Sequence, residues 1–254
     1  MSVSKIKATV FAQEQLASDV FSMWLEVGSI ASEAKPGQFI SVYSNDDSKL
    51  LPRPISICEI DRKNGRLRIV YRVVGYGTKE FSGCKAGDTL EIMGPLGNGY
   101  TLKKDKAILV AGGIGVPPML ELAKELDCEK TIVLGYRDEL FLNKEFEQYG
   151  KVVIATEDGS CGTKGNVLDA IRAESVDGQV IYSCGPTPML RALKQYAADK
   201  GIEAWISLEE KMACGIGACL ACTCQTKDVD EHSQVHNKRI CKDGPVFLST
   251  EVEI

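Results

Sequence analysis

The sequence predicts an all-β sandwich or barrel, then an α/β domain with a parallel sheet, then a small cysteine-rich domain. Within residues 1–101, short apolar runs alternate with turn segments such as "KPGQ", "DRKNG" and "KAGD", as in β-proteins. Within 102–210, apolar strands alternate with helical patterns, which favours a parallel sheet flanked by helices. Residues 211–254 hold half of the ten cysteines and few large apolar side chains, so a cofactor is expected to stabilise them.

The expected elements follow from these patterns in chain order. In the second region, Met119, Leu122, Ala123 and Leu126 recur at helical spacing and predict one buried helix face. Strands are expected at 39–44, 54–60, 66–75, 88–94, 107–113, 131–136, 151–157, 179–185 and 203–209, and helices at 117–127 and 188–201.

Composition narrows the class of protein. The chain has 254 residues and a formal net charge of −5, with acidity spread along it, so it offers no basic surface for nucleic acid. The first 24 residues mix charges with short apolar pieces, so they predict neither a signal peptide nor a membrane span. A cytoplasmic protein is therefore expected. In such a chain, ten cysteines favour metal ligation over a disulfide scaffold.

Two glycine-rich turns predict a nucleotide site. In "LVAGGIGVPPM", Gly112, Gly113 and Gly115 lie between an apolar strand and a helix, where backbone N–H groups can bind a pyrophosphate. Pro118 replaces the third glycine of the usual dinucleotide fingerprint, so a plain tight turn is the alternative. A second turn, "SCGPTPM", also ends a strand, and both are expected to line one crevice; its candidate residues are Cys184, Gly185 and Pro186.

The first 208 residues resemble the ferredoxin reductase family, in which an antiparallel Greek-key flavin barrel precedes a nicotinamide-binding domain. The resemblance rests on "PGQF" and on "RPIS", which matches the Arg-x-x-Ser flavin motif. It implies FAD contacts from the "RPIS", "VYR" and "GYGT" segments. The implied residues are Arg53, Pro54, Ile55, Ser56, Val70, Tyr71, Arg72, Gly77 and Thr78.

Two points of this resemblance stay open. The chain has Pro54 and Ile55 where many relatives carry an aromatic residue, so no residue is assigned to stack on the flavin. For the nicotinamide nucleotide, Glu157 and Asp158 favour NAD, because a 2′-phosphate calls for basic residues. Arg137 keeps NADP as the alternative.

Four cysteines have the spacing of an iron–sulfur site. Cys214, Cys219 and Cys222 form C-x4-C-x2-C, and Cys241 follows after a gap of eighteen residues, the plant-type arrangement for a [2Fe–2S] cluster. Cys224 falls outside this set, because Cys241 completes the four ligands; it is expected to pack beneath the loop or to act as an alternative ligand.

Zinc is the rival interpretation of this region. Cys219, Cys222, His232 and His236 could form a tetrahedral site of a non-enzymatic regulator. That choice leaves Cys214 and Cys241 unexplained, and the segment between the pairs lacks the apolar residues of a finger helix, so the cluster is preferred. A Rieske-type cluster that uses the histidines is a further alternative.

The stretch "EEKMACGIGACLACTC" with "CKDGPVF" resembles the electron-transfer subunits of type B dihydroorotate dehydrogenases, and this resemblance spans the whole chain. It implies FAD, one [2Fe–2S] cluster, NAD and a partner catalytic subunit that carries FMN, in a heterotetramer with two copies of each. Electrons would pass from dihydroorotate on the partner through the cluster and FAD to NAD+, in pyrimidine biosynthesis. The base that deprotonates dihydroorotate would lie on the partner. A reductase subunit for an oxygenase or for a sulfide- or ferredoxin-linked enzyme is the nearest alternative.

Overall fold

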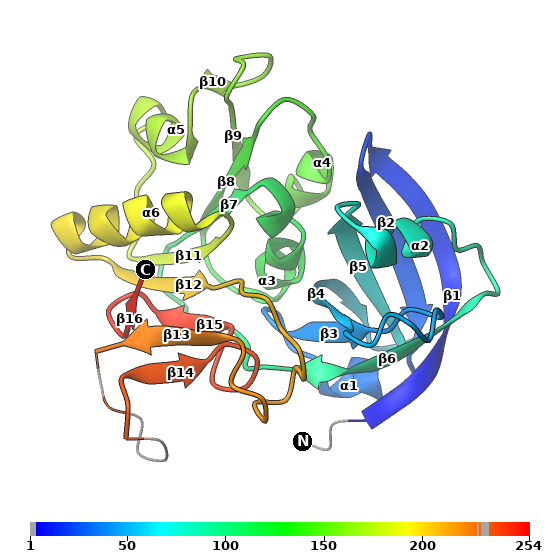
Figure 1. The fold of residues 1–254 in the computed structure, drawn as a ribbon. Coiled ribbons are helices and arrows are strands. Elements are labelled where there is room, and N and C mark those ends of the chain that lie inside the picture. The colour runs from blue at the N-terminus through cyan, green and yellow to red at the C-terminus, as the bar shows by residue number, and fades with distance from the viewer. Residues whose placement is uncertain (1–3, 228, 230–233) are drawn as a thin grey trace. The chain divides into compact units, whose positions relative to one another are not determined.

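The computed structural model describes residues 4–227, 229 and 234–254 (Figure 1). The chain divides into two compact units. The barrel unit comprises Met1–Gly99, Glu209–Thr223 and Arg239–Pro245, and the α/β unit comprises Tyr100–Leu208, Cys224–Lys238 and Val246–Ile254. The cysteine-rich tail is therefore shared between the two units.

The barrel unit contains a closed antiparallel barrel with the strand order β1-β2-β5-β4-β3-β6. Alternating side chains fill it: Ile55 and Ile57 of β4 point into the core, whereas Pro54 and Ser56 are half-buried on the outer face. The strands are β1 (Ser4–Ala17), β2 (Val20–Glu26), β3 (Phe39–Val42), β4 (Arg53–Asp61), β5 (Arg66–Arg72) and β6 (Thr89–Leu96), joined by the short helices α1 (Ile30–Glu33) and α2 (Tyr76–Phe81).

The α/β unit is built on a seven-stranded sheet with the order β10-β9-β8-β7-β11-β12-β15. Neighbouring strands from β10 to β12 are parallel, and the tail strand β15 adds to the edge in the antiparallel direction. The strands are β7 (Ala107–Gly112), β8 (Lys130–Tyr136), β9 (Lys151–Thr156), β10 (Thr163–Lys164), β11 (Val180–Cys184), β12 (Glu203–Ser207) and β15 (Val246–Leu248).

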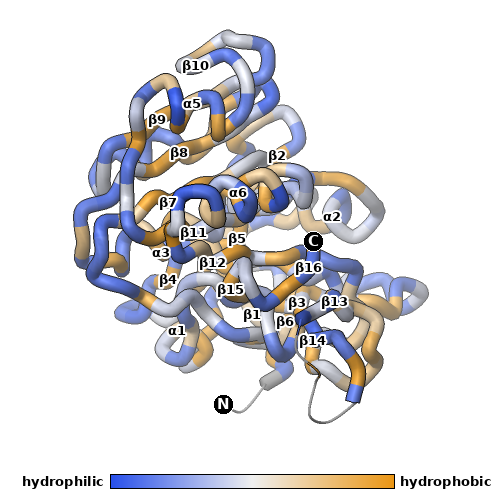
Figure 2. Tube along the Cα trace, turned by 90° about the vertical axis from the view of Figure 1, so that its left-hand side faces the viewer, coloured by the Kyte–Doolittle hydropathy of each residue, from blue (hydrophilic) through white to orange (hydrophobic). Residues whose placement is uncertain are grey.

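Helices cover both faces of this sheet. Ile108, Val110 and Ile181 form a core with α5 and α6, and the alternate residues Leu109 and Tyr182 are buried outside that core. Figure 2 shows hydrophobic residues along β8 and β9, as expected for strands inside a parallel sheet. The helices are α3 (Pro118–Glu125), α4 (Asn143–Phe146), α5 (Val167–Ala173) and α6 (Thr187–Lys200).

The expected fold class is confirmed, including the buried stripe of α3, where Met119, Leu122 and Ala123 have no exposed surface. The tail also forms a three-stranded sheet of β14 (Asn237–Arg239), β13 (Thr223–Thr226) and β16 (Val252–Glu253). In the described parts of the chain, no helix is long and apolar enough to cross a membrane.

Candidate functional site: flavin, nucleotide and cluster segments

The structure brings Arg53 and Gly77 together, although they are far apart in sequence. Arg53 begins β4, and its Nη1 donates to the carbonyl oxygen of Leu51 at 2.8 Å. Gly77 lies in the first turn of α2, and a Cβ atom there would lie 3.1 Å from Nε of Arg53. Glycine at this position therefore leaves room for the guanidinium, which has the donors and the charge to bind a phosphate.

The Thr78 hydroxyl forms its hydrogen bonds within its own loop. Its hydroxyl accepts from the N–H groups of Val74 at 3.0 Å and Gly75 at 3.2 Å and donates to the Gly75 carbonyl at 3.1 Å. These three bonds use the capacity of a hydroxyl. The Thr78 side chain thus fixes the loop, and only its backbone remains to hold a diphosphate.

Two more expected flavin residues have their side chains in the barrel core. Ile55 is 7% exposed, and Tyr71 packs against Phe21 and Phe81 while its hydroxyl donates to Gln13 at 2.9 Å. Burial raises the pKa of Tyr71 well above its usual range. At Ile55 and Tyr71 the expectation of a flavin contact is thus restricted to the backbone.

The neighbouring positions on β5 face the outer side of the barrel. Val70 is buried there, and Arg72 forms an ion pair with Asp19 at 3.1 Å. Together with Pro54 and Ser56 of β4, these side chains remain candidates for flavin contact.

The two glycine-rich turns meet at the ends of the adjacent parallel strands β7 and β11. A Cβ atom at Gly115 would lie 2.4 Å from the carbonyl oxygen of Cys184, and one at Gly112 would lie 2.7 Å from Sδ of Met189. Gly113, at φ +53°, opens the short turn between β7 and α3. The expectation that both turns line one crevice agrees with this packing, since ligands of such sheets bind beyond the carboxyl ends of strands.

The second turn starts α6. Gly185 has φ +157°, and a Cβ atom there would lie 2.5 Å from Cε of Met189. Pro186 caps α6 in an extended conformation. Both residues therefore allow the helix to begin directly behind the strand end, and the first N–H groups of a helix are suited to bind an anion.

The residues on which the choice between NAD and NADP depends lie at the ends of the neighbouring strands β8 and β9. The N–H of Glu157 donates to Tyr136 at 3.2 Å, and that of Asp158 to Arg137 at 3.4 Å. The Arg137 side chain is 84% exposed. A hydrogen bond from the Ser160 backbone lowers the pKa of Asp158, which keeps a negative charge at this edge.

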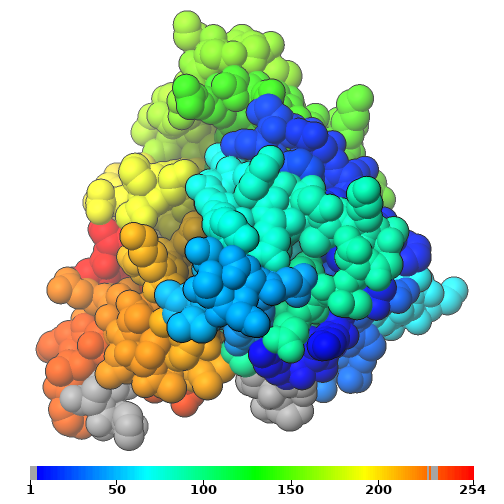
Figure 3. Space-filling view, turned by 45° about the vertical axis from the view of Figure 1, so that its right-hand side comes forward, coloured from blue at the N-terminus to red at the C-terminus, as the bar shows by residue number. Residues whose placement is uncertain are grey.

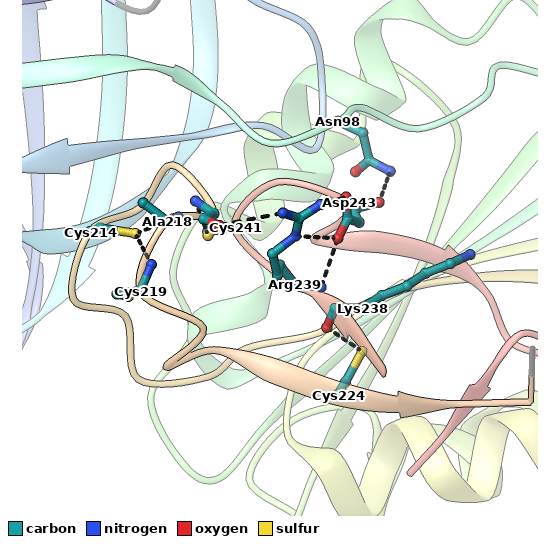
Figure 4. A network of polar contacts seen from close by, with 10 residues as sticks. Asn98, Cys214, Ala218, Cys219, Cys224, Lys238, Arg239, Cys241 and Asp243 are labelled. Atoms are coloured by element: carbon teal, nitrogen blue, oxygen red, sulfur yellow. Dashed lines mark hydrogen bonds and ion pairs between the residues drawn. The ribbon is translucent and has the colours of Figure 1, made fainter. Parts of the chain in front are cut away.

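The cysteine loop, residues 214–222, directs backbone N–H groups at two sulfur atoms. The N–H groups of Ala218 and Cys219 donate to Sγ of Cys214 at 3.3 and 3.4 Å, and that of Gly217 donates to Sγ of Cys241 at 3.1 Å (Figure 4). Burial acts to raise the pKa of Cys214, but the backbone donors outweigh it and lower the pKa to about 6. The loop therefore favours the thiolate that binds iron.

Cys222 and Cys241 form the buried side of this group, each 2% exposed. Burial, a hydrogen bond with Cys222 and the charge of nearby thiolates raise the pKa of Cys241 to about 12. Cys219, in contrast, is exposed. The donor set fits an iron–sulfur cluster, which supplies positive charge to offset the repulsion between thiolates.

No three histidine, cysteine or carboxylate side chains among the described residues are placed to hold a single metal ion. A [2Fe–2S] cluster divides its four ligands between two irons. The thiol of Cys224 donates to the Lys238 carbonyl at 3.6 Å, within the α/β unit. His232 of the zinc alternative lies outside the described residues, and Nδ1 of His236 lies 2.9 Å from the Lys227 carbonyl oxygen.

Sequence reasoning missed the charged residues around Cys241. Arg239 and Asp243 form a bidentate ion pair, with Nε to Oδ2 at 2.9 Å and Nη2 to Oδ1 at 3.1 Å. Opposite charges four residues apart, on either side of a predicted ligand, were the available signal.

Arg53→Ala is expected to weaken FAD binding, because it removes a charged donor from the predicted phosphate site. Loss of a charged hydrogen bond costs about 1.5–3 kcal/mol, or roughly ten- to a hundredfold in Kd. Fluorescence of released FAD during dilution measures this. Arg66→Ala, which removes an ion pair with Glu26 elsewhere on the barrel, is the control that should retain FAD. Equal retention in both variants would contradict the role of Arg53.

Family models match both ends of the chain. The model for the oxidoreductase FAD-binding domain covers residues 7–100, and that for the iron–sulfur cluster binding domain of dihydroorotate dehydrogenase B covers residues 209–253. The second match favours the cluster over the zinc alternative.

Several relatives are similar over nearly their whole length. The chain is 43% identical to the "Dihydroorotate dehydrogenase B (NAD(+)), electron transfer subunit" of Fusobacterium nucleatum, with 97% of each chain covered. It is 40% identical to the subunit of the same name from Bacillus caldolyticus, with 98% of this chain and 99% of that one covered.

Solved structures agree on the fold. An NADH-dependent reduced ferredoxin-NADP oxidoreductase aligns with a TM-score of 0.87 and 31% identity over 97% of this chain and 89% of that one. The ferredoxin reductase of a carbazole 1,9a-dioxygenase aligns with a TM-score of 0.65 and 22% identity over 80% and 67%. From its matches at both ends and its full-length relatives, the chain belongs to the family of dihydroorotate dehydrogenase B electron transfer subunits.

Proposed function

We propose that this chain carries electrons from a partner dihydroorotate dehydrogenase subunit to NAD+, through a [2Fe–2S] cluster and FAD, in pyrimidine biosynthesis. FAD, when bound, exchanges a hydride with nicotinamide and single electrons with the cluster. Residues 1–101, 102–210 and 211–254 serve as the flavin, nucleotide and cluster segments.

The placement of the cysteine loop on the barrel carries this proposal. A Cβ atom at Gly215, next to Cys214, would lie 2.9 Å from Oγ of Ser41 on β3. Ser41 is paired with Pro54 of the flavin motif on β4. The cluster ligands and the flavin motif are thus separated by one strand, which suits electron transfer between the groups they hold.

The side chains and backbone of this chain bind and orient the cofactors. Arg53, Ser56 and the loop at Gly77 hold FAD on the outer face of the barrel, and Cys214, Cys219, Cys222 and Cys241 ligate the cluster. The two glycine-rich turns bind the NAD+ pyrophosphate, and Glu157 or Asp158 accepts from a ribose hydroxyl. No residue of this chain is assigned to proton abstraction from dihydroorotate.

The partner is proposed to carry FMN and to form a heterotetramer, with two copies of each subunit, in the cytoplasm. The word "subunit" in the names of both full-length relatives supports a partner, and the NAD(+) in those names supports NAD over NADP.

The purified chain provides the first test. It should be yellow-brown, with one FAD per chain and equal amounts of iron and labile sulfide, and NADH should bleach the flavin absorbance faster than NADPH does. Colourless protein loaded with zinc would overturn the redox function.

A reductase that serves ferredoxin is the second candidate, favoured by the 31% identity to the NADH-dependent reduced ferredoxin-NADP oxidoreductase. The partner subunit that the chain binds distinguishes the two candidate functions. The proposal fails if the chain forms its stable complex only with a ferredoxin- or NADP-linked subunit and shows no binding to an FMN-containing dihydroorotate dehydrogenase.

Leu220→Asp is expected to weaken binding of the catalytic partner. Ile216 and Leu220 are 47% and 58% exposed on either side of exposed Cys219, and Figure 3 shows the orange segment that contains them at the surface. Exposed apolar side chains that lie in one patch mark interaction sites, and loss of a central one costs about 2 kcal/mol. Calorimetric titration measures the affinity. Leu102→Asp, at a position with 43% exposure in the α/β unit, is the control; equal losses would contradict the assignment.

A further inference from the structure

Arg239 contacts the cysteine loop through one carbonyl group. Its Nη1 donates to the carbonyl oxygen of Gly217 at 3.4 Å, and the N–H of the same peptide group, on Ala218, donates to Sγ of Cys214 at 3.3 Å (Figure 4). The N–H on the other side of Gly217 donates to Sγ of Cys241 at 3.1 Å. The guanidinium therefore bonds to the peptide group that donates to Cys214, and the next peptide group along the loop donates to Cys241.

Asp243 holds this guanidinium in place. Its carboxylate accepts from Nε and Nη2 of Arg239 and also from the Arg239 backbone N–H at 2.9 Å. The side chains of Arg239 and Asp243 are only 19% and 26% exposed, so solvent screens the pair less than it screens a surface ion pair.

The chain around Asp243 is itself anchored to the barrel. Nδ2 of Asn98 donates to the Asp243 carbonyl at 3.2 Å, and the Asn98 N–H bonds to the Gly244 carbonyl at 2.6 Å. The Arg239 carbonyl accepts from the N–H groups of Lys242 and Asp243, which closes the turn that carries Cys241. Asn98 therefore holds the segment that carries Asp243, and Asp243 in turn fixes the position of the guanidinium.

We propose that Arg239, oriented by Asp243, is a positioning residue that sets the reduction potential of the cluster. By polarising the Gly217–Ala218 peptide group, Arg239 strengthens the hydrogen bond from the Ala218 N–H to Sγ of Cys214. It also holds Gly217 in the position from which the Gly217 N–H donates to Sγ of Cys241. Such bonds, like a nearby positive charge, stabilise the reduced cluster, which carries one more negative charge than the oxidised cluster. The inference rests on the proposed function, because it requires the cluster on these thiolates.

Redox titration of the cofactor-loaded chain, followed by EPR, tests this role. In Arg239→Gln the reduced-to-oxidised ratio at fixed ambient potential should fall about tenfold, equivalent to about 59 mV toward more negative potential for one electron. Iron and sulfide contents should stay at the wild-type level, and the EPR spectrum of the reduced cluster should shift. Lys238→Gln removes the same charge from the preceding residue, whose ammonium pairs with Glu251 at 3.4 Å, and should shift the potential far less.

Arg239→Lys keeps the charge but lacks the planar fork, so its potential should lie between those of the wild type and Arg239→Gln. This variant also provides the measurement if Arg239→Gln does not retain a cluster. Unchanged potentials in the Arg239 variants, or equal shifts in Arg239→Gln and Lys238→Gln, would overturn the inference while leaving the proposed function intact. A wild-type chain without iron and sulfide would instead refute the proposed function.

Discussion

Cys222→Ser is expected to remove nearly all iron and labile sulfide from the protein, whereas Cys224→Ser retains the full content. Cys222 is buried beside Cys241, in the group that the cysteine loop surrounds. The thiol of Cys224 is directed at the Lys238 carbonyl instead. Iron and sulfide assays, with the visible absorbance of the cluster, measure both variants, and Cys214→Ser, Cys219→Ser and Cys241→Ser should behave as Cys222→Ser does.

Cys222→Ser and Cys224→Ser serve as controls for each other, because both exchange one sulfur for oxygen in the same short segment. A cluster that survives Cys222→Ser and is lost in Cys224→Ser would reverse the ligand assignment. Full iron content in Cys214→Ser would contradict the assignment of Cys214 as a ligand.

Gly115→Ala should weaken NAD+ binding at least tenfold. The new Cβ would lie 2.4 Å from the Cys184 carbonyl oxygen and 2.6 Å from the Gly185 nitrogen, so the two turns must move apart. Such overpacking costs about 1–3 kcal/mol of stability and displaces the backbone donors of the proposed pyrophosphate site. The KM for NADH in flavin reduction and the Tm of the chain measure the two effects.

Gly201→Ala is the matched control in the same unit. Gly201 ends α6 at φ +66° with open space around it, so alanine there has a backbone cost of about 1–2 kcal/mol without moving the nucleotide turns. Its KM for NADH should equal that of the wild type. If Gly115→Ala leaves the KM unchanged as well, the two turns do not form the nucleotide site.

Much of the fold could be predicted because its signals are local. Turn residues between apolar runs predict the barrel, and the change to helical spacing after residue 107 predicts the α/β unit. The strand β1 and the helix α5 lie outside the predicted elements: the first mixes charges with its apolar positions, and the second has only seven residues, which is too few for a clear helical pattern. That β15 joins the edge of the parallel sheet depends on long-range pairing, which sequence periodicity does not encode.

The same distinction between local motifs and long-range contacts applies to the site. Cysteine spacing and glycine-rich turns are sequence motifs, and they predict the candidate cluster and nucleotide residues. The use of the Thr78 hydroxyl within its own loop and the burial of Tyr71 in the barrel core follow from tertiary packing, so a motif could not reveal them. The contact of Arg239 with Gly217 joins residues that only the folded chain brings together.

The central claim is that electrons from dihydroorotate cross this chain to NAD+. The most direct measurement is anaerobic NAD+ reduction by the chain co-purified with an FMN-containing dihydroorotate dehydrogenase subunit, with dihydroorotate as the only reductant. The account predicts NADH formation that needs both subunits and is lost in Cys222→Ser but kept in Cys224→Ser. A stable complex, loaded with all cofactors, that reduces no NAD+ with dihydroorotate would contradict it.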